Sequence, residues 1–301
     1  MQAVVQLAGG GNGPPMMLSP QMGVVGSERM SEDASGAFRE TYADLYDRLL
    51  VPLLFAPYAQ IISRHVLRSH PRAILETAAG TGVLSHELAR DLPPDTSITA
   101  TDLNQPMLDK AQAKPGSANI AWRQADAMKL PFPNESFDLA VCQFGVMFFP
   151  DKAASFREIA RVLRRGGSYV FVVWDDWAQM EHAPLAMAAD VVSEILGCEP
   201  RSLVNPPYHD EATIRADLAT ARFEKIDIQR VTQPGRAASA HGAAVATVHG
   251  SLIRTVIESK APERLQEATD AVEQAFRVRY GDGEIAGSTK GLVIAAEKPA
   301  A

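Results

Sequence analysis

The chain has 301 residues, of which 46% are hydrophobic and 22% charged, values typical of a soluble globular protein with one large domain or two small ones. Its net charge of −7 repels phosphate, which argues against nucleic acid or an anionic membrane as substrate. Two distant cysteines, Cys142 and Cys198, provide neither a disulfide framework nor a structural metal site, so a cytoplasmic location is expected. No apolar run reaches the roughly 20 residues of a membrane-spanning helix, and the chain start lacks the positive charge of a secretory signal.

The N-terminal part divides into a tail and a helical region. Residues 1–35 are predicted to be a disordered tail, because the stretch from Gly9 to Pro15 can form neither a helix nor a strand. Helical spacing begins at Phe38, and Pro52 is expected to interrupt it. A second helical stretch follows and ends at Pro71.

From Arg72 onward, short apolar runs alternate with helical patterns, which predicts a parallel sheet flanked by helices. Strands are expected at residues 73–76, 97–101, 119–123, 137–142 and 168–174, with helices at 83–91, 105–113 and 152–164. In the last of these helices, Asp151 is expected to cap the start and Gly166-Gly167 to stop the end.

Beyond Trp174 the regular alternation is lost. Helices are expected around residues 185–196 and 211–221, around 252–257 and around 265–276, with late strands at 225–231 and 292–296. Asn205-Pro206-Pro207-Tyr208 has the form of a motif that grips a flipped base in DNA amino-methyltransferases. It lies far downstream of the fourth strand in an acidic chain, so we interpret it as a proline turn.

The segment Glu76-Thr77-Ala78-Ala79-Gly80-Thr81-Gly82 joins the first strand to the following helix. A turn this tight needs glycine, because a Cβ would collide with backbone or ligand. The N-terminus of the helix favours an anionic group, either a pyrophosphate or the carboxylate of an amino-acid moiety.

Carboxylates follow the next two strands. Asp102 ends the second strand, where it can accept hydrogen bonds from both hydroxyls of a ribose, and Asp126 follows the third. Taken alone, Asp102 could instead cap a helix and Asp126 could be an ordinary loop residue. Their order and their places at strand ends favour the ligand interpretation.

The loop resembles motif I of the class I S-adenosylmethionine (SAM)-dependent methyltransferases, with Ala78 in place of the first glycine. Residues 130–138 and 158–167 extend the resemblance to the ubiquinone-biosynthesis-like (type 11) group, over about residues 74–174. The resemblance implies a doubly wound, Rossmann-like α/β fold with a seven-stranded sheet, its last strand antiparallel, and helical insertions covering the active site. It also implies a domain over residues 36–298, made of a helical lid (36–70), a cofactor-binding core (72–175) and substrate-cover insertions (176–285).

SAM is the implied cofactor, with no metal, and the implied partner is a small, hydrophobic or aromatic acceptor; a homodimer is left open. The implied cofactor-binding residues are Glu76, Ala78, Gly80, Gly82, Asp102, Leu103, Met107, Asp126, Ala127, Gln143, Phe144, Tyr42 and Tyr46. The proton acceptor is not identified, and His182, His209 and His241 are weak candidates because they lie in the expected cover.

Two other interpretations stay open. Gly80-Thr81-Gly82-Val83-Leu84-Ser85 nearly fits the Gly-x-Gly-x-x-Gly pattern of an NAD-dependent oxidoreductase, although Ser85 stands where glycine or alanine is expected. Alternatively, the chain could be a SAM-binding partner subunit without catalytic turnover.

Overall fold

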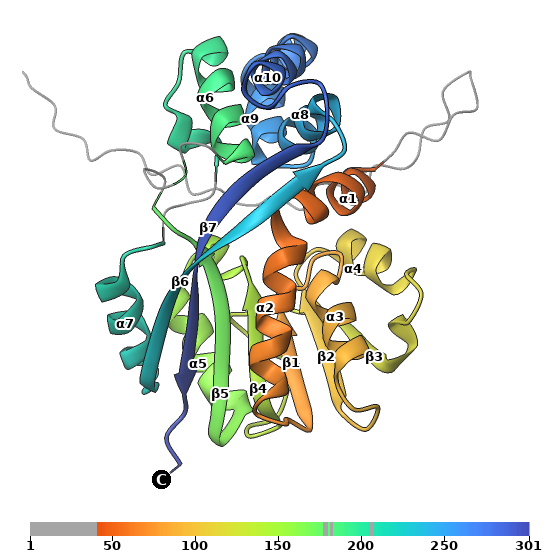
Figure 1. The fold of residues 1–301 in the computed structure, drawn as a ribbon. Helices are drawn as coiled ribbons and strands as arrows, with labels where there is room; N and C mark the ends of the chain where they lie inside the picture. The colour runs from red at the N-terminus through yellow and green to blue at the C-terminus, as the bar shows by residue number, and fades with distance from the viewer. Residues whose placement is uncertain (1–40, 177–179, 181–182, 205–207, 301) are drawn as a thin grey trace, which may run out of the picture. The chain divides into compact units, whose positions relative to one another are not determined.

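In the computed structural model, the described residues are 41–300 without 177–179, 181–182 and 205–207. The predicted tail, residues 1–35, lies outside them. Glu40–Ala301 forms one compact unit around a seven-stranded sheet in the order β3-β2-β1-β4-β5-β7-β6 (Figure 1).

Six strands of this sheet run in one direction and β7, between β5 and β6, runs antiparallel to them. The strands that pair in parallel are β1 (Ala73–Thr77), β2 (Ser97–Asp102), β3 (Ile120–Gln124), β4 (Phe137–Gln143) and β5 (Leu163–Trp174). β7 (Ile285–Glu297) pairs antiparallel with both β5 and β6 (Glu224–Ala237). The predicted fold class, including the antiparallel last strand, is confirmed.

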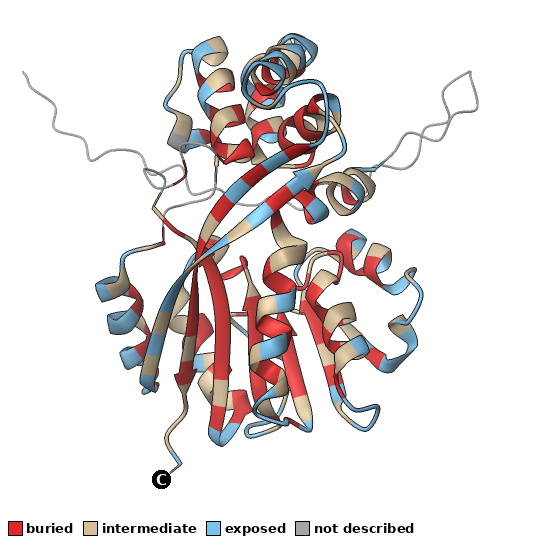
Figure 2. Ribbon diagram, viewed as in Figure 1, coloured by how far each residue is buried: buried red, intermediate tan, exposed pale blue. Residues whose placement is uncertain are grey.

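Helices cover both faces of the sheet (Figure 1). α2 (Ala56–Leu67) and α3 (Val83–Asp91) pack together on one face, and α5 (Lys152–Val162) and α7 (Glu211–Thr220) pack together on the other. α4 (Gln105–Gln112) lies against β2 and β3. Figure 2 shows the buried residues concentrated along the central strands, as expected for strands with both faces covered.

The predicted break at Pro52 is wrong. α1 (Tyr42–Leu45) continues through η1 (Tyr46–Phe55), a π-helical stretch that contains Pro52, into α2. In this wider turn, Ala56 N–H donates to Val51 O, five residues earlier. A π-helical turn spreads the backbone where proline would otherwise clash with the carbonyl four residues before it, so the helix passes Pro52 without ending.

The combined helix Tyr42–Leu67 is long and apolar enough to cross a membrane by length and composition, but half of its most apolar window is buried inside the protein. Tyr58, Ile62 and Val66 are fully buried in the core under the sheet. These contacts are those of a core helix. The cytoplasmic location stays a prediction.

The predicted end of the 152–164 helix is wrong by two residues. Asp151 caps it as expected, accepting from Ala154 N–H at 2.8 Å, but α5 ends at Val162 and β5 begins at Leu163. Gly167 therefore lies inside β5, where a Cβ would come within 2.9 Å of Asp138 O. Glycine here permits close approach of β5 to β4 and does not stop a helix.

A helical cap lies at the carboxyl ends of the strands (Figure 1). We use "cap" for α6 (Pro184–Leu196), α8 (Ala240–His249), α9 (Leu252–Lys260) and α10 (Leu265–Tyr280), which share a hydrophobic core with Leu50, Leu53 and Leu54 of η1. α8 was not predicted because its alanine-rich sequence has no clear apolar stripe. β6 and β7 are also longer than predicted, and their pairing continues to Ala237↔Ile285 beside the cap.

Candidate cofactor and acceptor site

The loop between β1 and α3 bends sharply at three residues with left-handed backbone. Ala78, Gly80 and Gly82 have φ angles of 54°, 57° and 79°. Ala79 N–H donates to Thr101 O at 2.9 Å, which holds the loop against the end of β2. A Cβ on Gly82 would lie 2.6 Å from Trp122 Cη2, so this glycine is needed for packing as well as for conformation.

Ala78 is the residue that departs from the motif, and Gly145 faces it. A Cβ built on Gly145 would lie 2.4 Å from the Cβ of Ala78 and 2.7 Å from Cys142 Sγ. The absence of a side chain at Gly145 therefore makes room for the methyl group of Ala78. The space removes the steric clash, while the left-handed conformation of Ala78 itself still costs about 1 kcal/mol.

Asp102 at the end of β2 fastens the loop from the other side. Gly80 N–H donates to Oδ2 and Asn104 N–H donates to Oδ1, both at 2.8 Å. The N-cap of α4 is Asn104, so the alternative role of Asp102 as that cap is wrong. Each carboxylate oxygen has a second lone pair, which leaves Asp102 able to accept from two ligand hydroxyls. Burial raises the pKa of Asp102 above its ordinary value.

Glu76 lies beneath the loop. Its side chain is buried and accepts a hydrogen bond from Ser85 Oγ in the first turn of α3. Burial is the main cause that raises its pKa to about 8. Glu76 therefore joins the end of β1 to the start of α3, and its predicted contact with the cofactor stays a prediction.

Apolar groups and a second carboxylate lie beside Asp102. Leu103 is 56% exposed, one of two large hydrophobic side chains this exposed among the described residues, whereas Met107 and Ala127 are buried. Asp126 Oδ1 accepts from Met128 N–H at 2.8 Å. An exposed apolar side chain next to carboxylates fits a ligand with a flat ring and hydroxyl groups, which is the chemistry of adenosine.

The N-terminal helix lies over the loop. The Tyr46 hydroxyl lies 3.9 Å from where a Gly80 Cβ would be, and burial raises the pKa of this phenol well above its ordinary value. Asp47 accepts from Thr81 Oγ1 at 2.7 Å and pairs with Lys114, which also donates to Thr81 O at 2.8 Å. Sequence reasoning did not find this polar clamp, because the three residues are far apart in the chain.

Aromatic rings extend from Tyr46 to the ends of β4 and β5. Tyr46 stacks on Phe55 with ring centroids 5.4 Å apart, and Phe55 lies 5.5 Å from Phe144. Phe144 directly follows β4 with a left-handed φ of 55°, and it stacks on Trp174 at 3.8 Å. Strained non-glycine backbone of this kind is often found at functional sites. Gln143, before it, donates through Nε2 to Phe55 O at 2.7 Å.

Comparison with known proteins relates the part of the chain that carries this site to methyltransferases. Residues 74–167 match the family model described as a methyltransferase domain. The demethylmenaquinone methyltransferase of Deinococcus radiodurans is 32% identical over 149 residues, 47% of this chain and 61% of that protein. The ubiquinone/menaquinone biosynthesis C-methyltransferase UbiE of Pseudomonas paraeruginosa is 28% identical over 176 residues, 53% of this chain and 68% of that protein. The chain carries a class I SAM-dependent methyltransferase domain.

A solved SAM-dependent methyltransferase of Thermotoga maritima has the same fold as this domain, with a TM-score of 0.51 and 16% identity over 86% of this chain and 97% of that one. The resemblance of the motifs to the ubiquinone-biosynthesis-like group is confirmed, and with it SAM as the cofactor of this class. The chain spans less than two thirds of the Deinococcus protein, 61% of its length.

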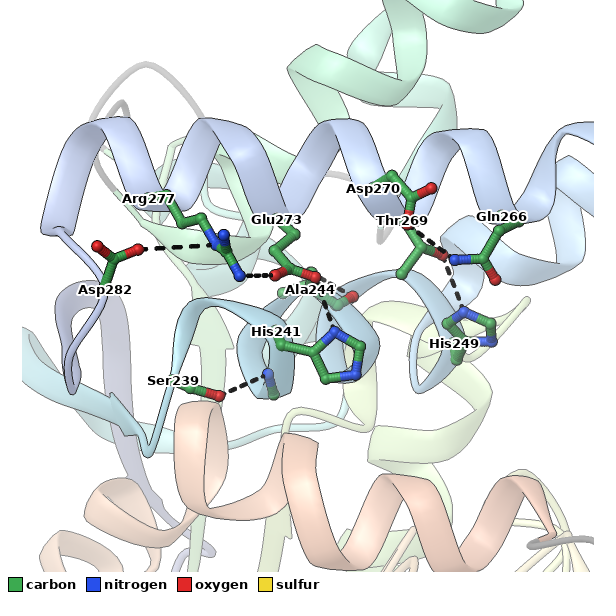
Figure 3. Close-up of polar contacts among 12 residues, drawn as sticks. Ser239, His241, Ala244, His249, Gln266, Thr269, Asp270, Glu273, Arg277 and Asp282 are labelled. Atoms are coloured by element: carbon green, nitrogen blue, oxygen red, sulfur yellow. Dashed lines mark hydrogen bonds and ion pairs between the residues drawn. The ribbon is translucent and has the colours of Figure 1, made fainter.

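Two of the three histidines named from the sequence lie within the described residues, in separate segments. His182 lies outside the described residues, and His209 Nε2 lies 3.7 Å from Asp176 Oδ1. His241 on α8 bonds Glu273 on α10 at 2.7 Å and is 66% exposed (Figure 3). Among the described residues, no three His, Cys, Asp or Glu side chains group as metal ligands.

His249, at the end of α8, was not singled out from the sequence. Its Nε2 lies 2.9 Å from Thr269 Oγ1 (Figure 3). Thr269 donates its own hydroxyl proton to Leu265 O at 2.8 Å. The hydroxyl oxygen therefore accepts from His249 Nε2–H, which leaves the lone pair of neutral His249 on Nδ1. Burial lowers its pKa and favours this neutral form.

Proposed function

We propose that this protein transfers the methyl group of SAM to a small, hydrophobic or aromatic metabolite. The observation that carries the proposal is the Asp102–Gly80 hydrogen bond of 2.8 Å, because it joins the loop to a strand-end carboxylate in a methyltransferase domain. The demethylmenaquinone and ubiquinone/menaquinone methyltransferases, by their names, act on quinone precursors. Their similarity supports an aromatic acceptor here.

We propose that the cofactor lies along the carboxyl edge of β1, β2 and β3. Asp102 would accept from the ribose hydroxyls, while Leu103 and Ala127 cover the adenine and Asp126 faces its amino group. Tyr46 would close the site near Gly80, where its hydroxyl already lies. In this proposal residues 36–70 are the lid, residues 72–175 the cofactor core, and residues 176–285 the substrate cover.

When bound, SAM supplies a methyl group already activated by a positively charged sulfur. The protein then has to orient the acceptor and exclude water. Phe55, Phe144 and Trp174 provide an apolar wall at the ends of β4 and β5, and the cap covers this edge (Figure 1). A planar acceptor that stacks on such a wall is held without a charged partner.

The test is release of S-adenosylhomocysteine (SAH) with a panel of phenols, quinols, amines and carboxylates. Release with a phenol or quinol is the expected result. SAH binding by calorimetry should be weakened by Asp102→Ala and unchanged by Asp95→Ala, an exposed carboxylate at the opposite end of β2. Undiminished affinity in Asp102→Ala would contradict the assigned role of this residue.

The two rival functions give different results in the same assays. An oxidoreductase would be retained by an immobilised nicotinamide and not by immobilised SAH; the match to a methyltransferase family argues against it. A non-catalytic SAM-binding subunit would bind SAH and release none with any member of the panel.

A further inference from the structure

Trp174 lies where the sheet and the cap meet. It packs against the sheet core, against the cap core and against a small cluster of Met180, Ala183 and Ala186. It is the last residue of β5, at the edge where open α/β sheets bind ligands. Phe55 lies 6.0 Å from its ring and connects it, through Tyr46, to the cofactor loop.

At the ends of the neighbouring strands β4 and β5, two polar atoms are buried and have no hydrogen-bond partner among the described residues: Trp174 Nε1 and Gln143 Oε1. The Gln143 amide is oriented by its bond to Phe55 O, which requires the NH₂ group on that side and leaves the oxygen free to accept. The indole nitrogen can only donate. Buried polar groups in folded proteins nearly always have a hydrogen-bond partner. A donor and an acceptor without one, at the ends of two neighbouring strands, therefore point to a ligand.

We infer that Trp174 is a specificity-determining residue whose indole N–H donates to an oxygen of the methyl acceptor, while Gln143 Oε1 accepts from a hydroxyl of the same molecule. This inference rests on the proposed function. The surrounding rings select a flat apolar body, and the two polar atoms select oxygen substituents. The substrate class is therefore a hydroxylated or carbonyl-bearing aromatic compound. Phe55 contacts both residues, through its ring to Trp174 and through its carbonyl oxygen to Gln143.

Naphthol and naphthalene test this inference, because they differ only in the hydroxyl group. Their binding is measured by calorimetry in the presence of SAH, so turnover is not required. Wild type should prefer naphthol by about tenfold, and Trp174→Phe, which keeps an aromatic ring without the N–H, should lose most of that preference. Trp122→Phe is the matched control: its indole donates to Ser117 O at 3.4 Å, away from β5, so the preference should remain.

A second measurement does not depend on the folding of Trp174→Phe. The chain has three tryptophans, so the Trp174 indole signal of nitrogen-labelled protein can be assigned by elimination with Trp122→Phe and Trp177→Phe. Naphthol should shift this signal downfield and naphthalene should not. An equal preference in wild type and Trp174→Phe, or an indole signal indifferent to naphthol, overturns the inference. Failure of SAH itself to bind overturns the proposed function as well.

Discussion

Replacing Gly82 by alanine should destabilise the protein by more than its backbone conformation explains. Gly82 and Gly116 share left-handed backbone, with φ of 79° and 85°, but only Gly82 is crowded. At Gly116 a Cβ meets nothing within 4 Å, so Gly116→Ala should cost about 1 kcal/mol of unfolding free energy, the conformational term alone. At Gly82 the new Cβ would lie 2.6 Å from Trp122 Cη2 and 3.1 Å from the Ala111 Cβ, which adds about 1–3 kcal/mol of overpacking.

The Trp122 ring cannot easily move away, because it is held by its hydrogen bond to Ser117 O and lies 5.6 Å from the ring of His86. Urea unfolding followed by circular dichroism gives the free energies of both variants. Adding Trp122→Phe to Gly82→Ala removes the clashing atom and should recover part of the loss, which a double-mutant cycle measures. Equal losses for Gly82→Ala and Gly116→Ala would refute the packing argument.

Three further predictions concern the loop and its supports. Asp102→Ala removes the acceptor for Gly80 N–H and the proposed ribose contact, so the SAH dissociation constant should rise by about 10- to 100-fold in calorimetry. Gly145→Ala should be destabilising in the wild-type background and less so with Ala78→Gly, because the 2.4 Å contact between the two Cβ positions is then relieved; independent effects in thermal unfolding would argue against that contact. Burial raises the pKa of Glu76 from 4.5 to about 8, so the folded state keeps a proton that the unfolded state loses, and its contribution to stability falls as pH rises through that range. Glu76→Gln cannot titrate, so the unfolding free energy of this variant relative to wild type should increase between pH 5 and pH 8, by on the order of a few kcal/mol. A difference that stays constant with pH would contradict the titration of Glu76.

The cofactor side of the site could be predicted because its signals are local. A glycine-rich turn after an apolar run, with carboxylates after the next two strands, predicts that Gly80, Asp102 and Asp126 lie on one edge of the sheet. The strand predictions were correct to within about two residues for β1 to β4 for the same reason. Each of these signals depends only on residues that are close together in the sequence.

The proposed acceptor side could not be predicted in this way, because contacts between segments far apart in the sequence form it. The helix continues past Pro52 in a π-helical turn, since η1 packs with the cap through Leu50, Leu53 and Leu54. α8 is stabilised by the same core and has no apolar stripe of its own. Trp174 ends a predicted strand, but the sequence does not show that three hydrophobic clusters meet at its ring or that its N–H has no partner among the residues the structure describes.

The departure at Ala78 shows how the motif and the fold share one steric requirement. A first glycine would leave space between the loop and the turn after β4; here alanine fills that space, and the chain has glycine at position 145 instead. This contact has room for one Cβ, and Gly145 leaves that room to Ala78; a Cβ at position 145 would also lie 2.7 Å from Cys142 Sγ. Gly145 directly follows Phe144, whose backbone is left-handed and whose ring stacks on Trp174. A substitution at Ala78 is therefore expected to shift the turn that holds Phe144 against Trp174. Changes in the cofactor loop should then alter the affinity for the proposed acceptor as well as the affinity for SAH.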